Sequence, residues 1–200
     1  MCFCITDRLK LNLHKILIHH NIIPSKKIKI ADQLGFRSEE GAMKKAILKT
    51  ARLLKQPGKA SMQDFKIKWE NLSAKGTRML MARPDIEKLI GKGNESMAED
   101  NNRNFPRFMA ALFLDYEPEV FVDTVLWVFR AYRSHGFQTT YWAANLNLWV
   151  DLLEKDLTPE AFEDIYPFYN WLIVNIPVFV ALTDLDLLDH DPLRSPVNPK

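Results

Sequence analysis

The sequence predicts an all-α domain of six to eight helices, on three observations. Apolar residues recur at spacings of three and four through most of the chain beyond residue 38, which is the period of an amphipathic helix. Helix start and stop signals, such as Pro118, Gly136 and the Thr158–Pro159 pair, separate these runs. The domain has no convincing run of alternating apolar and polar residues, so no strand is expected in it.

Each expected helix follows from a periodic apolar run and its boundary residues. The expected helices are Glu39–Lys55, Met62–Ala82, Asp85–Ile90, Asn94–Tyr116, Glu119–Ser134, Tyr141–Lys155 and a last helix that starts at Pro159. Ser38, Ser61 and Thr158 are expected N-caps, because their side-chain oxygens can accept a free backbone N–H. Pro106 is expected to break the fourth helix near Asn104, because proline cannot donate to the preceding turn.

These helices define a domain of residues 38–184, preceded by a basic arm (1–37) and followed by a Pro-rich tail (185–200). The arm is expected to be poorly ordered or a short helix, since its apolar residues keep neither period. The segment Glu117–Thr183 should decide the fold, because it holds four of the five tryptophans and four of the five tyrosines. Helices this rich in rings bury a large apolar area.

Charge is divided unevenly along the chain. Residues 1–60 carry thirteen Lys and Arg against four Asp and Glu, whereas residues 116–200 carry five against thirteen. This asymmetry indicates either a solvated basic face with acids at helix ends, or an arm that meets an acidic surface of its own domain or of a partner. Nucleic-acid binding is not expected, because the basic stretch from Lys26 to Lys59 offers only Phe36 for base stacking.

The composition favours a cytoplasmic protein. Cys2 and Cys4 are too close together for a disulfide framework, which fits a reducing compartment. Met1–Asn21 lacks the apolar core and small-residue cleavage site of a signal peptide. The most apolar run, Trp171–Leu188, is interrupted by polar residues and a proline, so a membrane span is not expected.

The helix order from Asn94 to Thr183 resembles the globin family: a polar-to-apolar helix, a buried helix, a sharp turn and two long antiparallel helices. The stretch from His135 to Trp142 (HGFQTTYW) is similar to the globin corner, where a glycine turn leads into a capped helix that opens with a bulky ring. Among globins, the chain most resembles the non-haem sensor domains of stressosome regulators, and more distantly the phycobiliproteins. The resemblance implies a globin-like fold, a sensory or regulatory role without catalysis, and signalling to a separate protein.

The resemblance does not carry over a cofactor ligand, so no cofactor is expected. A haem globin has a histidine late in the helix before this corner, and the matching position here is near Ala131, which cannot ligate iron. A bilin-binding cysteine is also missing from the domain sequence. The alternative is a haem protein that senses oxygen or redox state with His135 as axial ligand. A place at a helix C-terminus explains His135 without a ligand.

A ligand pocket is expected near the polar start of the helix at Asn94. The residues proposed to line it are Met97, Asn101, Phe105, Trp127 and Arg130. Asn94, Asn101 and Asn102 could line such a cavity; the alternative for them is a solvated first turn that frays easily, because asparagine competes with helical hydrogen bonding.

Arg130 and Arg133 have a simpler interpretation as partners in structural ion pairs, since a lone buried arginine is costly. The acids within reach of this helix and its neighbours are Asp123, Asp151 and Glu154.

No catalytic constellation stands out, so an enzyme is not expected. Cys2 and Cys4 are separated by one residue, which is shorter than the usual spacing in zinc sites, and no metal site is predicted. Gly91–Asn94 lacks the strand and the Lys-Ser/Thr pair of a phosphate-binding loop.

The domain is expected to form a homodimer through one helix face. Its last three helices carry more apolar surface than a domain of this size easily buries. Aromatic residues are frequent interface anchors, and one or two of three tryptophans are expected near the surface. These tryptophans are Trp142, Trp149 and Trp171. The basic face Met43–Lys59 is expected to lie away from the interface, because like charges across a two-fold axis repel.

Overall fold

The computed structural model describes residues 36–189, and every regular element in that range is a helix. The helices are α2 (Phe36–Ala51), α3 (Lys59–Met81), α4 (Ile86–Ile90), α5 (Glu95–Leu112), α6 (Pro118–Ser134), α7 (Thr139–Asp156) and α8 (Pro159–Asp189). The expected all-α fold of six to eight helices is confirmed. The expectation for the basic arm falls outside the described residues, except that α2 includes positions 36 and 37.

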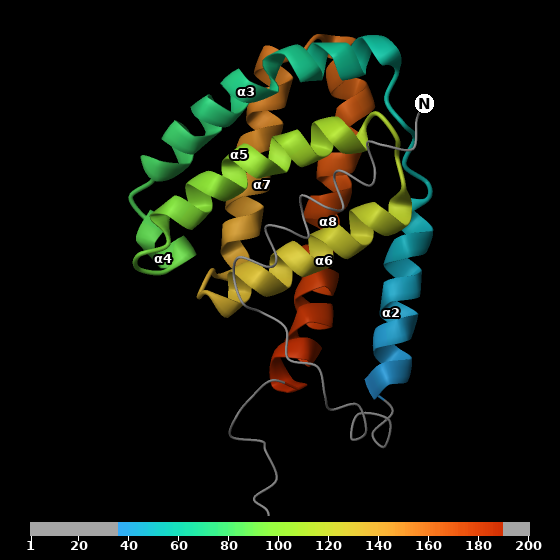
Figure 1. The fold of residues 1–200 in the computed structure, drawn as a ribbon, viewed down its shortest axis with the longest axis vertical. Helices are drawn as coiled ribbons and strands as arrows, with labels where there is room; N and C mark the ends of the chain where they lie inside the picture. The colour runs from blue at the N-terminus through green and yellow to red at the C-terminus, as the bar shows by residue number, and fades with distance from the viewer. Residues whose placement is uncertain (1–35, 190–200) are drawn as a thin grey trace, which may run out of the picture. The chain divides into compact units, whose positions relative to one another are not determined.

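The long helices run in two directions, as Figure 1 shows: α2, α7 and α8 run along the long axis of the view, and α3, α5 and α6 lie across them. α7 and α8 run side by side in opposite directions, and α6 crosses in front of α8. α3 packs on α5 and also contacts α7 and α8. α2 lies on the side of α8 that is away from α7. A hydrogen bond of 3.0 Å from Trp171 Nε1 to Thr50 Oγ1 joins α8 to α2.

Aromatic rings fill the space between these helices. Trp142 of α7 stacks on Phe129 of α6 with ring centroids 4.2 Å apart, and Trp171 of α8 lies 5.0 Å from Phe121 of α6. Trp142, Trp149 and Trp171 are only 5%, 0% and 6% exposed. The expectation that one or two of them lie near the surface is therefore wrong. The crossing helices hold the largest rings in the core, where they remove most apolar area from water.

α5 continues without a break through Pro106, contrary to the expected break near Asn104. Proline at this position cannot donate to the carbonyl of Asn102, four residues earlier. The hydroxyl of Ser73, on α3, donates to that carbonyl instead, at 2.9 Å. Ser73 and Asn102 are both buried, so this bond satisfies an acceptor that water does not reach.

We expect Ser73→Ala to lower the free energy of unfolding by about 1–3 kcal/mol, because it leaves the Asn102 carbonyl buried without a donor. Pro106→Ala restores the missing N–H in α5, so Ser73→Ala should cost clearly less in that background. A double-mutant cycle by urea unfolding measures this coupling. Equal costs of Ser73→Ala in the two backgrounds would contradict the compensation.

The N-termini of α3 and α8 cap each other. The carboxylate of Asp164, on α8, accepts hydrogen bonds from the Gly58 N–H at 2.9 Å and the Ser61 hydroxyl at 2.6 Å. The carboxylate of Asp64, on α3, accepts from the Thr158 N–H at 2.9 Å. Ser61 is therefore not the expected N-cap but a residue inside α3. Its hydroxyl and the N–H of the N-cap residue, Gly58, both donate to the distant carboxylate of Asp164. Thr158 does cap α8, since its Oγ1 accepts from the Ala161 N–H.

Ser38 also lies inside a helix, because α2 begins two residues earlier, at Phe36. At the other end of the domain α8 continues to Asp189 and so includes the first five residues of the expected tail. The rest of that tail, residues 190–200, lies outside the described residues.

Both capping aspartates have pKa values below the usual carboxyl range. The bonds from Ser61 and Gly58 lower the pKa of Asp164. Burial alone would raise the pKa of Asp64, but hydrogen bonds from Lys68 and Thr158 outweigh it and lower the value. A carboxyl whose pKa is lower in the folded state stabilises the fold above its unfolded pKa, near 3.8. That stabilisation is lost as the pH falls through the folded pKa.

We therefore expect Asp64→Ala with Asp164→Ala to cost about 1 kcal/mol per cap near pH 7, and much less near pH 3. The matched control is Asp64→Asn with Asp164→Asn, which keeps a capping oxygen but removes the titration. Urea unfolding at the two pH values compares the three chains. If the cost of the alanine pair does not change with pH, the reciprocal caps do not contribute as charged groups.

One helix of the described residues passes a length and composition test for a membrane span, contrary to the sequence-based expectation. It is Pro159–Asp184 of α8, with a mean hydropathy of 1.5 in its most apolar window, of which 39% is buried inside the protein. A single such helix is weak evidence for a membrane, since the core helix of a globular protein passes the same test. The observation does show that α8 is apolar on more than its core face.

Candidate functional site

Two adjacent asparagines of α5 face α7 in the interior. Asn101 Nδ2 donates to the Tyr141 hydroxyl at 2.9 Å, and Asn102 Oδ1 accepts from Trp149 Nε1 at 3.1 Å. Asn101 is 6% exposed and Asn102 is fully buried. The alternative of a solvated, frayed turn is therefore wrong for these two residues, because their amides bind polar groups of α7. The hydrogen bond from Asn101 to Tyr141 therefore joins α5 to α7.

Asn145 extends this polar contact along α7, one turn from Tyr141 and one turn from Trp149. It is 2% exposed, and its Oδ1 has no hydrogen-bond partner within residues 36–189. Asn102 Nδ2 is a buried donor that also lacks a partner in this part of the chain. Buried amides of this kind are usually satisfied by each other or by an internal water, so they belong to the structure of the α5–α7 contact.

The remaining residues of the expected ligand pocket lie on α5, where Met97 and Phe105 are one turn before and after Asn101, and on α6. Phe105 is one of the core rings, with centroids 6.1 Å from Trp149 and 5.6 Å from Tyr169. The carbonyl of Met97 lies 3.5 Å from the Tyr132 hydroxyl, near the start of α5. Trp127 and Arg130 are half-buried on α6. The described contacts therefore place the five residues in several environments, and a shared pocket stays a prediction.

The corner between α6 and α7 is held by backbone and amide bonds. Gly136 has φ +93°, which glycine adopts without strain. Asn94 donates to the carbonyls of Ile90, at 2.8 Å, and His135, at 2.7 Å, so it ties the start of α5 to this corner. The Gln138 N–H donates to the Leu89 carbonyl at 2.8 Å. The role of Asn94 is thus to fix the corner.

His135 ends α6 and is exposed. Its Nδ1 lies 2.7 Å from the carbonyl of Ala131 in the same helix. A ligand histidine often makes such a bond, which leaves Nε2 for a metal. An axial haem ligand stands inside an apolar pocket, however, and the buried positions beside this corner are filled by the Phe129–Trp142 stack. His135 in this position does not fit a haem-binding core.

Arg133 forms the ion pair expected for it, but with a different acid. Its guanidinium donates to the Val180 carbonyl at 3.1 Å, to Thr183 Oγ1 at 2.6 Å and to the Asp184 carboxylate. Asp123, one of the expected partners, instead lies 2.8 Å from Lys44 of α2. Sequence reasoning missed Asp184 because it lies 51 residues from Arg133 along the chain, and no local pattern pairs the two.

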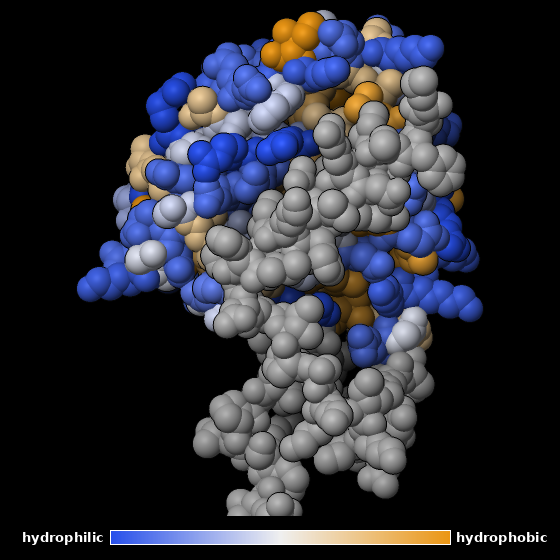
Figure 2. Space-filling model, viewed as in Figure 1, coloured by the Kyte–Doolittle hydropathy of each residue, from blue (hydrophilic) through white to orange (hydrophobic). Residues whose placement is uncertain are grey.

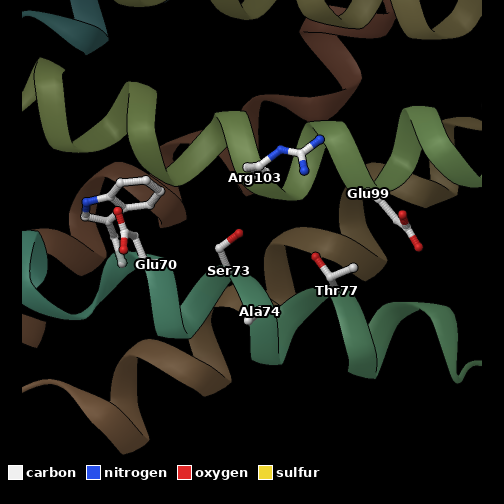
Figure 3. A pocket seen from close by; sticks show the side chains of 7 residues that line it. Glu70, Ser73, Ala74, Thr77, Glu99 and Arg103 are labelled. Atoms are coloured by element: carbon white, nitrogen blue, oxygen red, sulfur yellow. The ribbon is translucent and has the colours of Figure 1, made fainter.

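A shallow groove of about 500 Å³ lies between α3 and α5 (Figure 3). Its lining residues are Trp69, Glu70, Ser73, Ala74, Thr77, Glu99 and Arg103. The hydroxyl of Ser73 is occupied by the Asn102 carbonyl, and Arg103 pairs with Asp100 of its own helix. Ser73, Ala74 and Thr77 are small residues three and four apart on α3, and this spacing could have predicted a groove on that helix face. It offers polar and charged contacts, but its lining contains no nucleophile–base pair.

The groups with shifted pKa values have structural explanations. Burial raises the pKa of Tyr141 and of Tyr169, which are core residues. The Arg83 side chain lowers the pKa of Asp85 through a hydrogen bond, and Arg52 does the same for Glu119. No cluster of three or more His, Cys, Asp or Glu that suits a metal occurs in the described part of the chain. The perturbed groups therefore mark helix ends and the core.

The outer face of α8 carries the clearest unexplained feature, which we name the α8 stripe. Its members recur every three or four residues and are exposed or half-buried: Tyr166, Pro167, Asn170, Ile173, Val174, Pro177, Val178 and Ala181. Residues 165–183 contain no charged side chain, and Val174 is 60% exposed. On the face seen in Figure 2, by contrast, the surface over α3 and α5 is mostly hydrophilic, with hydrophobic residues in small separate groups.

Comparison of the chain with protein-family models, with curated proteins and with solved structures gave no match.

Proposed function

We propose that this domain is a non-catalytic sensory or regulatory module that acts by self-association through the α8 stripe and signals to a separate protein. The α8 stripe is the observation that carries the proposal. A contiguous exposed apolar surface usually marks an interface, and this one runs along a helix without a single charged residue between Asp164 and Asp184. The globin-like interpretation is a second support: α5, α6, the Gly136 corner and the α7–α8 pair follow the order that motivated it.

Sedimentation equilibrium at micromolar concentration tests self-association. We expect a dimer for the natural chain and a monomer for Val174→Glu, which places a charge on the stripe at a position exposed enough to tolerate it. The matched control is Ile67→Glu, which changes a 70% exposed residue of α3 and should leave the dimer intact. A natural chain that remains monomeric contradicts the proposal.

Titration with haemin separates this proposal from the haem alternative. We expect no sharp Soret band. A Soret band that disappears in His135→Ala would replace the proposal with a haem-binding function.

A further inference from the structure

α2 has less of its surface in the core than the other long helices. Between Glu40 and Ala51, only Ile47 and Ala51 are buried, whereas α7 buries eight residues along its length. Most of the stability of a helix in a protein comes from packing of its apolar face. α2 gains little from such packing, so its polar contacts with the rest of the domain matter more.

Two aromatic side chains hold the C-terminal turn of α2. Trp171 Nε1, on α8, donates to Thr50 Oγ1 at 3.0 Å. The Tyr116 hydroxyl, just before α6, donates to the Ala51 carbonyl at 2.7 Å. Both rings also pack on Phe121 of α6, with centroids 5.0 Å and 6.1 Å away. α2 therefore lies over an aromatic face that presents one N–H donor and one O–H donor.

Two ion pairs join α2 and the residue after it to the first turns of α6. Lys44 Nζ lies 2.8 Å from Asp123 Oδ1, and Arg52 Nη2 lies 2.6 Å from Glu119 Oε1. The four side chains are 48–61% exposed, so water and salt screen both pairs. A helix held in this way opens locally at a lower free energy than the core helices.

We infer that α2 is a removable cover over a helix-binding face, and that a partner protein places a basic amphipathic helix on this face when α2 is released. The face, which we name the α2-binding face, consists of Tyr116, Glu119, Phe121, Asp123 and Trp171. Its two acids require a basic ligand, and its aromatic rings require an apolar strip between the basic groups. The chain's own ligand has this pattern in Lys44, Ile47, Ala51 and Arg52. The inference names the surface for signalling to a separate protein, and so rests on that part of the proposed function.

A fluorescently labelled peptide of residues 38–56 is the probe for this face. In the natural chain α2 competes with the peptide, because a tethered helix has a high effective concentration. Lys44→Glu with Arg52→Glu in the full chain removes both ion pairs and leaves the α2-binding face unchanged. Fluorescence anisotropy is expected to show that the peptide binds this variant at least about tenfold more tightly than it binds the natural chain.

Hydrogen exchange checks that the same variant releases α2. Amides from Ile47 to Ala51 should exchange faster than in the natural chain, whereas amides near Trp149 should exchange at the same rate. Exchange of the α2 amides at the natural rate would overturn the inference, because the ion pairs would then not hold the cover.

The matched control is Lys45→Glu with Lys49→Glu, which makes the same charge change in the same helix. Both lysines are exposed, and neither forms an ion pair within residues 36–189. At 100° per residue they lie on the side of α2 opposite Ile47. This variant should exchange its amides and bind the peptide about as the natural chain does. A tighter binding equal to that of the released variant would overturn the role of the two ion pairs.

Reversal of the face locates the binding. A full chain with Glu119→Lys and Asp123→Lys should not bind the natural peptide, but should bind a peptide that carries Lys44→Glu and Arg52→Glu. Circular dichroism checks that this chain keeps its helix content. A reversed face that binds both peptides equally would overturn the inference, as would a released chain that does not bind the natural peptide.

Failure of this inference can be distinguished from failure of self-association. Val174 lies in the α8 stripe and outside the α2-binding face, so Val174→Glu should leave peptide binding unchanged. Dimerisation therefore reports on the α8 stripe, and peptide binding reports on the α2-binding face. Loss of peptide binding in Val174→Glu would show that the peptide lies on the stripe, and would overturn the inference.

Discussion

Replacement of Trp149 by alanine is expected to lower the free energy of unfolding by about 3–5 kcal/mol. Trp149 is fully buried, and its ring lies edge-on to Phe105 with centroids 6.1 Å apart. It also lies against Gly76 of α3, where an added Cβ would stand 3.6 Å from its ring. Alanine would leave a cavity where α3, α5 and α7 meet, and would remove the Nε1 donor that binds Asn102. Urea unfolding followed by circular dichroism measures the loss.

Trp149→Phe separates packing from hydrogen bonding. It keeps most of the ring volume and removes the bond to Asn102, so we expect a smaller loss of about 1–3 kcal/mol. Ile67→Ala, at a 70% exposed position, should change stability by less than about 0.5 kcal/mol. If Trp149→Ala lowers the free energy of unfolding by less than about 1 kcal/mol, then α3, α5 and α7 move together to fill the cavity. The Trp149 ring would then not be needed for their contact.

The helices could be predicted because the information for them is local. Spacings of three and four report which positions face the core, and Pro118, Gly136 and Thr158 mark boundaries through their own backbone or hydroxyl chemistry. The ends of α6 and the start of α8 therefore agree with the structure. Local information fails where a distant group completes the helix.

Two elements show this failure in physical terms. α3 begins before Ser61 because Asp164, far along the chain, accepts hydrogen bonds from the Gly58 N–H and the Ser61 hydroxyl. α5 passes through Pro106 because Ser73 replaces the donor that proline lacks. In both cases a tertiary hydrogen bond satisfies the backbone group, and no local pattern shows which residue supplies it.

The sequence predicted apolar surface left uncovered on the last helices, but not which residues of α8 carry it. α8 is apolar around most of its circumference, so its periodicity does not show which face is covered. One or two of Trp142, Trp149 and Trp171 were expected near the surface because aromatic residues anchor interfaces, but a large ring gains most from burial. Smaller residues such as Val174, Pro177 and Ala181 are left outside. Packing against α6, α7 and α2 decides which face of α8 is covered, and the sequence of α8 alone does not predict that packing.

Loss of Arg133 is expected to have the second large effect, because this residue fastens the end of α8 to α6. Its side chain is only 13% exposed, and it binds the Val180 carbonyl, Thr183 Oγ1 and the Asp184 carboxylate together. We expect Arg133→Met to lower the free energy of unfolding by about 1–3 kcal/mol. The cost stays below that of breaking a fully buried pair, since the Asp184 side chain is 50% exposed and remains hydrated when its partner is removed.

The same change should also loosen α8 locally. The last turns of α8, from Val180 to Asp189, are expected to exchange their amide hydrogens faster in Arg133→Met, whereas residues near Phe168 should exchange as in the natural chain. Arg133→Lys is the conservative comparison and should recover only part of the stability, because one ammonium group cannot reproduce the planar fork. Arg52→Met, which removes an exposed ion pair with Glu119, should cost less than about 0.5 kcal/mol. Exchange rates in α8 that do not change in Arg133→Met would show that packing against α6 and α7, and not this arginine, holds the helix to its end.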